Sequence, residues 1–116
     1  MKRGSVYAGY ILMLLIATSC NNRKYTLTIF SSSPDGKTKQ EVHTISASND
    51  SLAYARGATL YLLAMHAYRK MSANAKPYIS KPTTFNLVDE TGKNVDSLLG
   101  KENAEAIRTE IKTLIN

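Results

Sequence analysis

The stretch YTLTIF, residues 25–30, alternates apolar and polar side chains. Tyr25, Leu27 and Ile29 fall on one face, as in a strand that turns one side toward a core. A single strand cannot bury that face by itself, so its neighbours in the chain must supply partner strands and a covering helix.

A turn and a second strand follow this stretch. Ser33–Gly36, SPDG, combines a proline that presets φ, an aspartate that bonds to nearby backbone and a glycine that accepts a positive φ. Gln40–Ala47 is the predicted second strand, with Val42 and Ile45 as its apolar residues. The two strands are therefore expected to form an antiparallel hairpin.

A long helix is predicted after the hairpin. Residues 48–51, SNDS, offer several N-cap side chains, and the helix is expected over about Leu52–Met71. Tyr54, Tyr61 and Tyr68 recur every seven residues, which places them on one face. A tyrosine face is either a platform for a ligand or part of the core with its hydroxyl groups at the rim. We favour the core.

Small residues share the tyrosine face of this helix. Gly57 and Ala64 leave room for a close neighbour, which indicates close packing of the helix on the sheet. Arg56, His66 and Lys70 gather on the opposite side, which is expected to face solvent.

Shorter elements follow an irregular connection. Thr83–Val88 is the predicted third strand, with Phe85 and Leu87 on one face. Asp89–Gly92 has the composition of a turn, and Lys93–Val95 is expected to return as a short fourth strand.

The chain ends in a second helix. Asp96 or Ser97 is expected to cap a brief helical turn that Gly100 ends, and Lys101–Ile115 is the final helix, which we expect to belong to the core. The fold class is therefore α+β, a small antiparallel sheet with two helices packed on it, in the order β-β-α-β-(β)-α. The apolar stripe of the last helix consists of Ala104, Ile107, Ile111, Leu114 and Ile115.

Size and charge limit the possible functions. Residues 25–116 suffice for one small domain and are too few for two. The chain has 15 basic and 9 acidic residues, a net charge of +6, and removing Lys2 and Arg3 leaves 13 basic residues, a net charge of +4. This mild excess favours anionic lipid or an acidic partner. The basic residues are scattered along the sequence, so we expect no nucleic-acid partner.

The first 19 residues have the pattern of an export signal. Two basic residues precede an apolar run at residues 6–16, and three small residues follow at 17–19. The run is shorter than the roughly 20 residues that span a bilayer, so a cleaved signal is favoured over an uncleaved membrane anchor.

Ala17-Thr18-Ser19-Cys20 resembles the lipobox of bacterial lipoproteins, whose usual form is Leu-Ala/Ser-Gly/Ala-Cys. The resemblance covers about 20 residues and rests on a cysteine directly after small residues at the end of the apolar run; the departure is Ala17, where leucine is usual. It implies that signal peptidase II cleaves before Cys20, and that this residue, the one cysteine of the chain, carries a covalent diacylglyceryl group. The thiol is then unavailable, and no other cofactor is expected.

Residues 20–24 are then a short lipidated tether, and residues 25–116 the domain. Sorting rules of Gram-negative lipoproteins associate an aspartate after the cysteine with inner-membrane retention. Here Asn21 and Asn22 follow it. The resemblance therefore implies a lipoprotein of the outer membrane that faces the periplasm.

Chemistry-bearing residues are sparse in the domain. His43 and His66 have no cysteine, histidine or aspartate neighbour at ligand spacing, so no metal site is predicted. Asp89 and Glu90 form an acidic pair, but a turn beside a glycine favours a surface role over acid–base catalysis. No nucleophile motif is present, and no catalytic residue is predicted.

These features favour a non-catalytic envelope lipoprotein that binds a membrane or envelope protein as an accessory or assembly module. Its membrane lipid contact would be through Cys20. Two alternatives remain open. One is an inhibitor or immunity-type lipoprotein directed against a toxin or hydrolase, and the other is a small enzyme with an unrecognised site.

Overall fold

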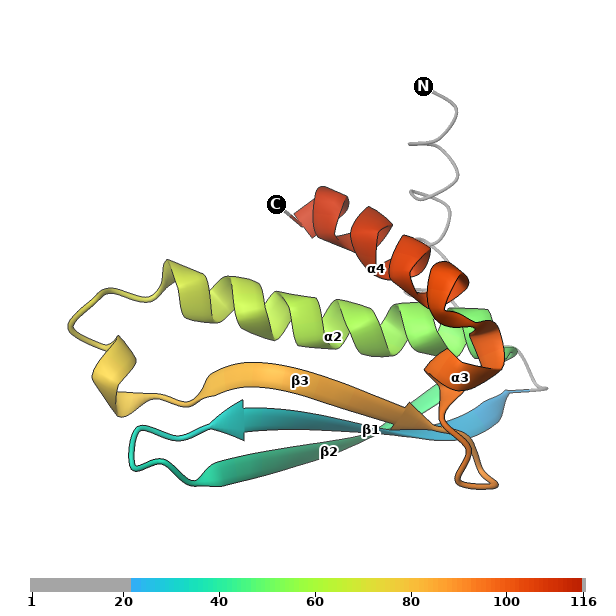
Figure 1. Cartoon of the computed structure of the whole chain (residues 1–116), viewed down its shortest axis with the longest axis horizontal. Coiled ribbons are helices and arrows are strands. Elements are labelled where there is room, and N and C mark those ends of the chain that lie inside the picture. The colour runs from blue at the N-terminus through green and yellow to red at the C-terminus, as the bar shows by residue number, and fades with distance from the viewer. Residues whose placement is uncertain (1–21, 116) are drawn as a thin grey trace.

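The protein contains a three-stranded antiparallel sheet with its helices on one side (Figure 1). The computed structural model describes residues 22–115, so the predicted signal segment and Cys20 lie outside the described residues. In the sheet, the order of the strands is β2-β1-β3. The predicted α+β class is confirmed. The elements are β1 Arg23–Ser32, β2 Thr38–Ala47, α2 Asp50–Lys70, the short 3-10 helix η1 Lys76–Tyr78, β3 Lys81–Val88, α3 Val95–Leu99 and α4 Lys101–Ile115.

β1 and β2 form the predicted hairpin, and each begins two residues earlier than expected. The turn between them is closed by the Gly36 N–H, which donates to the Ser33 carbonyl at 2.9 Å, and Gly36 has a φ of 86°. Of the two apolar residues predicted for the second strand, Ile45 is buried, whereas Val42 is 62% exposed. The two residues differ because an odd spacing along a strand places them on opposite faces.

β3 pairs with the other side of β1, so β1 is the central strand. Leu27 of β1 lies opposite Leu87 of β3, and both side chains are buried. The register shifts between Phe30 and Ser31, which marks an irregularity near the end of β1.

α2 lies across the inner face of the sheet. The Asn49 side chain caps it by accepting the Leu52 N–H at 2.8 Å, so one of the predicted caps is confirmed. A Cβ at Gly57 would lie 3.3 Å from Leu27 Cδ1. The missing side chain therefore permits the predicted close approach of the helix to the sheet.

The predicted fourth strand is wrong. After the turn at residues 89–92, the described chain makes one isolated bridge, Val88 to Asn94, and then enters α3. Val95 is completely buried in the core, and this inward position draws the chain away from the sheet edge. α3 begins after Asn94, which makes no side-chain cap, so neither Asp96 nor Ser97 is the cap.

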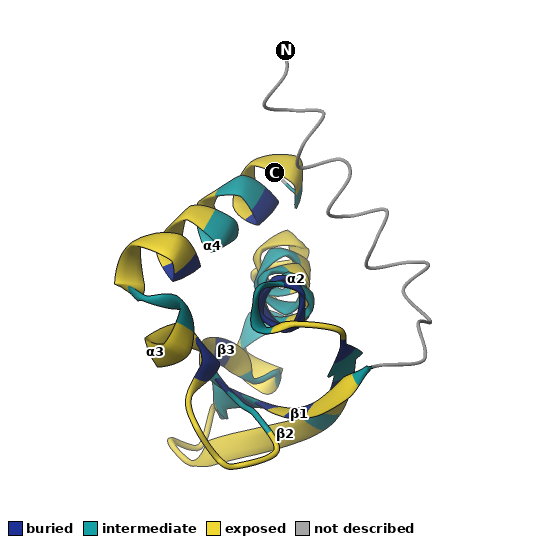
Figure 2. Cartoon of the chain, turned by 90° about the vertical axis from the view of Figure 1, so that its right-hand side faces the viewer, coloured by how far each residue is buried: buried dark blue, intermediate teal, exposed yellow. Residues whose placement is uncertain are grey.

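α4 has its predicted bounds and packs on α2, forming a further layer above the sheet (Figures 1 and 2). Ala104 and Ile111 are buried, and Ile107 and Ile115 pack against the core, which confirms that this helix belongs to it. Leu114 is 46% exposed, so its predicted place in the buried stripe is wrong. None of the helices of residues 22–115 has the length and apolarity needed to cross a membrane.

Candidate functional site: a pocket beside Arg108

The residues considered from the sequence do not come together in one site. His43 Nε2 lies 2.9 Å from Glu41 Oε1 at the surface of β2, and His66 lies on α2. Residues 22–115 contain no group of three histidine, cysteine, aspartate or glutamate side chains arranged to hold a metal ion.

The acidic pair has a structural role. The Asp89 carboxylate accepts the Thr91 hydroxyl at 2.7 Å and the backbone N–H groups of Thr91 and Lys93 at 2.9 and 3.0 Å. The Thr91 hydrogen bond, followed by the Lys93 N–H, holds the pKa of Asp89 below its usual value. Glu90 accepts the Lys24 N–H at 2.9 Å. The pair therefore secures a turn and the start of β1.

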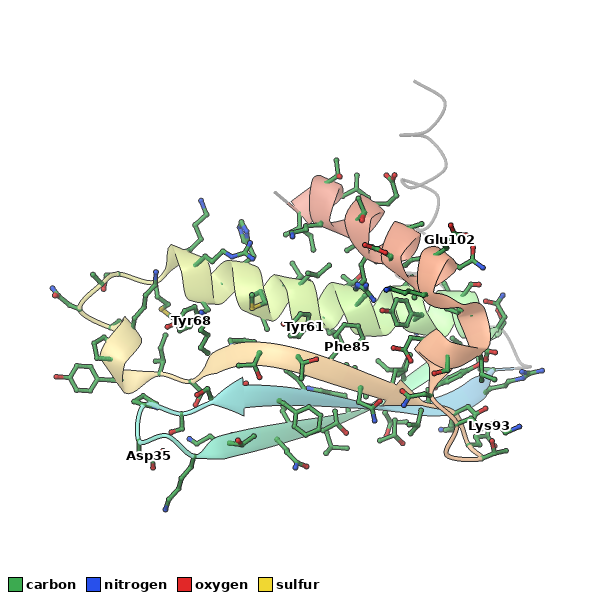
Figure 3. All side chains as sticks on the ribbon, in the orientation of Figure 1. Asp35, Tyr61, Tyr68, Phe85, Lys93 and Glu102 are labelled. Carbon is green, nitrogen blue, oxygen red and sulfur yellow. The ribbon has the colours of Figure 1, made fainter. Side chains whose placement is uncertain are left out.

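The tyrosine face divides between core and surface. Tyr54 is buried, as expected for a core residue, and its ring centroid lies 5.7 Å from that of Phe85. Tyr61 is half-buried, with a ring centroid 5.0 Å from that of Phe85 (Figure 3). Lys76 Nζ lies 5.5 Å from the ring centroid of Tyr68. The first two tyrosines thus build an aromatic wall together with Phe85.

This wall lines a pocket of about 220 Å³ between α2, β3, α4 and the chain entering α3. Its lining combines aromatic rings with amide, carboxylate and guanidinium groups. The lining residues are Tyr54, Tyr61, Thr84, Phe85, Asn86, Leu87, Asn94, Asp96 and Arg108.

Arg108 is the best-fixed polar group of the pocket. Its Nη1–H donates to the Tyr54 hydroxyl oxygen, which joins α4 to the buried start of α2. Burial raises the pKa of Tyr54, and the Arg108 guanidinium opposes that shift. The phenol therefore keeps its proton at neutral pH, and its oxygen remains an acceptor for the guanidinium.

The pocket has the chemistry of a binding site. A guanidinium held in place presents several N–H donors in a plane, which matches a carboxylate. Asp96 and the amides of Asn86 and Asn94 add acceptors and donors around it. A second pocket of about 220 Å³ is also lined by Asp96 and Arg108, so these two side chains are shared by both pockets.

A further cleft of about 240 Å³ lies between β2 and α2 and includes Ile45, Thr59 and Leu60. Arg56 Nη1 donates to the Ser46 carbonyl across it at 2.8 Å. That contact ties the helix to the free edge of the sheet, and we regard this cleft as structural.

Comparison of the chain with protein-family models, curated proteins and solved structures finds no match.

Sequence reasoning missed Arg108, although a signal was present. Arg108 lies four residues after Ala104 and three before Ile111, so helical spacing places it beside the buried stripe. A charged residue at such a position needs a partner. Its partner Tyr54 lies 54 positions earlier, and a local pattern carries no information about that distance.

Proposed function

We propose that this chain is a membrane-tethered, non-catalytic lipoprotein of the bacterial envelope that binds another protein as an accessory or assembly module. The lipobox-like sequence ending in Cys20 supports the tether. The pocket beside Arg108 supports the binding role.

The observation that carries the binding role is the composition of the pocket. Tyrosine and arginine are the residue types that most often dominate binding energy at protein interfaces, above all in concave positions. Tyr61 and Arg108 line one pocket, and the Tyr54 contact fixes the arginine before any partner arrives. Such preorganisation lowers the cost of binding. An acidic side chain of a partner that enters beside Tyr61 would meet the guanidinium.

Site-specific photo-crosslinking in the native cell tests this role. A photoreactive amino acid at Asn86, in the pocket, should capture one discrete protein. The same amino acid at Val42, which is 62% exposed on the outer face of the sheet, is the matched control and should not. Arg108→Lys keeps the charge but loses the planar donors, and should weaken the Asn86 product at least several-fold. Equal products from both positions, or products insensitive to Arg108→Lys, would contradict the proposal.

The tether is short, because β1 begins at Arg23. Two residues, Asn21 and Asn22, lie between it and Cys20, and the three Cα–Cα steps reach at most about 11 Å when fully extended. The domain would therefore stay beside the bilayer, with the start of β1 toward the lipid. Inserting a flexible linker of about 20 residues after Asn22 should impair function and leave folding intact. Full function with the linker would show that proximity is not required.

Lipidation has its own test. Cys20→Ala should abolish incorporation of labelled palmitate and leave a longer, uncleaved precursor, whereas the control Ser19→Ala keeps a small residue before the cysteine and should be processed normally. Normal processing of Cys20→Ala would refute the lipid anchor and leave the pocket untouched.

A further inference from the structure

The net charge of the domain lies at one end. Within residues 32–39 and 69–81 there are six basic residues and one acidic residue, Asp35, a net charge of +5. Residues 22–115 as a whole carry 13 basic and 9 acidic residues, a net charge of +4, so the remainder has a net charge of −1. We call these two segments the basic end. Its basic residues are Lys37, Lys39, Arg69, Lys70, Lys76 and Lys81.

The fold brings these residues together from separate parts of the sequence. The β1–β2 turn, the last turn of α2, η1 and the start of β3 all lie at the same end of the molecule, opposite the start of β1 (Figures 1 and 3). The pairing of Ser32 with both Thr38 and Lys81 fixes that arrangement. The basic residues look scattered in the sequence because two separate chain segments supply them.

The basic side chains of the basic end form no ion pairs with the carboxylates of residues 22–115. No carboxylate of residues 22–115 lies within 4.0 Å of any of its six basic side chains. Five of the six residues are exposed, and the sixth, Lys76, lies over the Tyr68 ring. Like charges gathered at one end repel one another, and an approaching anionic surface relieves that repulsion.

Apolar groups are exposed among these charges. Tyr78 in η1 is 84% exposed, and Met71 at the end of α2 is 45% exposed. Tyrosine between lysines is typical of the level of lipid headgroups, where the ring meets the boundary and the ammonium groups meet phosphate.

The predominance of lysine over arginine favours an anionic lipid surface over a protein or a nucleic acid as the partner of the basic end. Five of the six basic residues are lysines. Lysine is depleted at protein–protein interfaces, and arginine supplies most planar contacts to phosphates and bases in nucleic acids. A diffuse layer of anionic headgroups, in contrast, attracts lysine and arginine alike through charge alone. We propose that the basic end is a contact site for an anionic lipid surface.

The position of the basic end also predicts how the domain lies on the bilayer. The 21 residues of α2 extend about 31 Å, so the basic end lies about 30 Å from the start of β1. A domain tethered near Arg23 that also contacts lipid through its basic end lies lengthwise along the bilayer. Only this orientation rests on the proposed tether. The charge distribution does not depend on Cys20, so the two proposals can fail separately.

Vesicle partitioning of the full chain tests the contact. Every variant carries Cys20→Ala, so covalent lipid plays no part, and pure phosphatidylcholine vesicles measure any uptake through the apolar residues 6–16. The test variant changes Lys37, Lys39, Lys76 and Lys81 to glutamine. The matched control changes Lys24, Lys93, Lys101 and Lys112 to glutamine, the same loss of net charge at other places in the domain. Circular dichroism should show the parent fold in both variants.

The expected result is a large difference between the two variants on mixed phosphatidylcholine and phosphatidylglycerol vesicles. Loss of the four basic-end lysines should lower the partition coefficient by about 100-fold, and the control should lower it by less than about 5-fold. Added salt should remove the difference. Equal losses in the two variants, or parent binding that is indifferent to phosphatidylglycerol, would overturn the proposal. So would a single-stranded oligonucleotide that binds the parent more tightly than the mixed vesicles do.

Discussion

The two halves of α2 have different surroundings. All of the described buried residues of the helix fall in its first half, which ends at Ala58, and the second half, Thr59–Lys70, contributes none. The first half lies under α4 and beside α3, whereas the second half continues over the sheet toward the basic end (Figure 1). One continuous helix is therefore fully buried in places at one end and only partly covered at the other, where Tyr61 and Leu62 pack against the edge of the core.

The largest predicted effect concerns the cover of the buried half. Ile111→Ala should lower the free energy of unfolding by about 2–5 kcal/mol, because a buried side chain is lost and a cavity remains. Leu114→Ala, in the same helix but 46% exposed, should cost less than about 0.5 kcal/mol. Denaturant titration of both variants measures the difference, and equal values would show that α4 does not pack as described.

A pH-dependent effect is expected at the start of the helix. The Tyr25 hydroxyl donates to Asp50 Oδ1 at 2.8 Å, and burial, followed by that bond, raises the pKa of Tyr25 from 10.0 to about 12. Between these values the unfolded chain loses the proton while the folded chain keeps it, so stability falls as pH rises from 10 to 12, by about 2–3 kcal/mol.

Tyr25→Phe provides the control for this effect, because it removes the titrating group and keeps the ring. The variant should be less stable at neutral pH, and its stability should fall less steeply above pH 10. Parallel curves for parent and variant would show that Tyr25 titrates normally.

A second pair of variants compares the two halves directly. Gly57→Val should destabilise by about 1–3 kcal/mol, because even the first carbon of the new side chain would lie 3.3 Å from Leu27 Cδ1. Ala67→Val, at an exposed position in the second half, should cost only the difference in helix propensity, about 0.5 kcal/mol or less. Thermal unfolding of the two variants measures the two losses of stability. A larger loss at Ala67 would reverse the assignment of core and surface.

Local patterns predicted most of the fold. The hairpin turn depends on proline and glycine within four residues, and α4 on an apolar repeat within 15 residues, so the sequence held all of the required information. The prediction of a strand at Lys93–Val95 was wrong because Val95 packs into a core that distant segments build. The prediction that Leu114 is buried was wrong because the apolar stripe is wider than the face of α4 that meets α2.

The candidate site was much less accessible to prediction. Tyr54 and Tyr61 were identified as one face, but Phe85 and Arg108 join them from other elements. The basic end depends in the same way on two segments, residues 32–39 and 69–81, that meet when β3 pairs with β1. Sequence periodicity describes one element at a time, and both surfaces form where several elements meet.

The position of β1 has a mechanical consequence. β1 lies between β2 and β3 and is bonded to both, so a load that enters the domain at Arg23 and runs along the strand meets two ladders at once. The bonds of antiparallel ladders lie across the strands, so such a pull shears many of them together instead of opening them one by one. An edge strand under the same load would be held by one ladder only. The domain is therefore joined to its amino-terminal side through its most resistant strand.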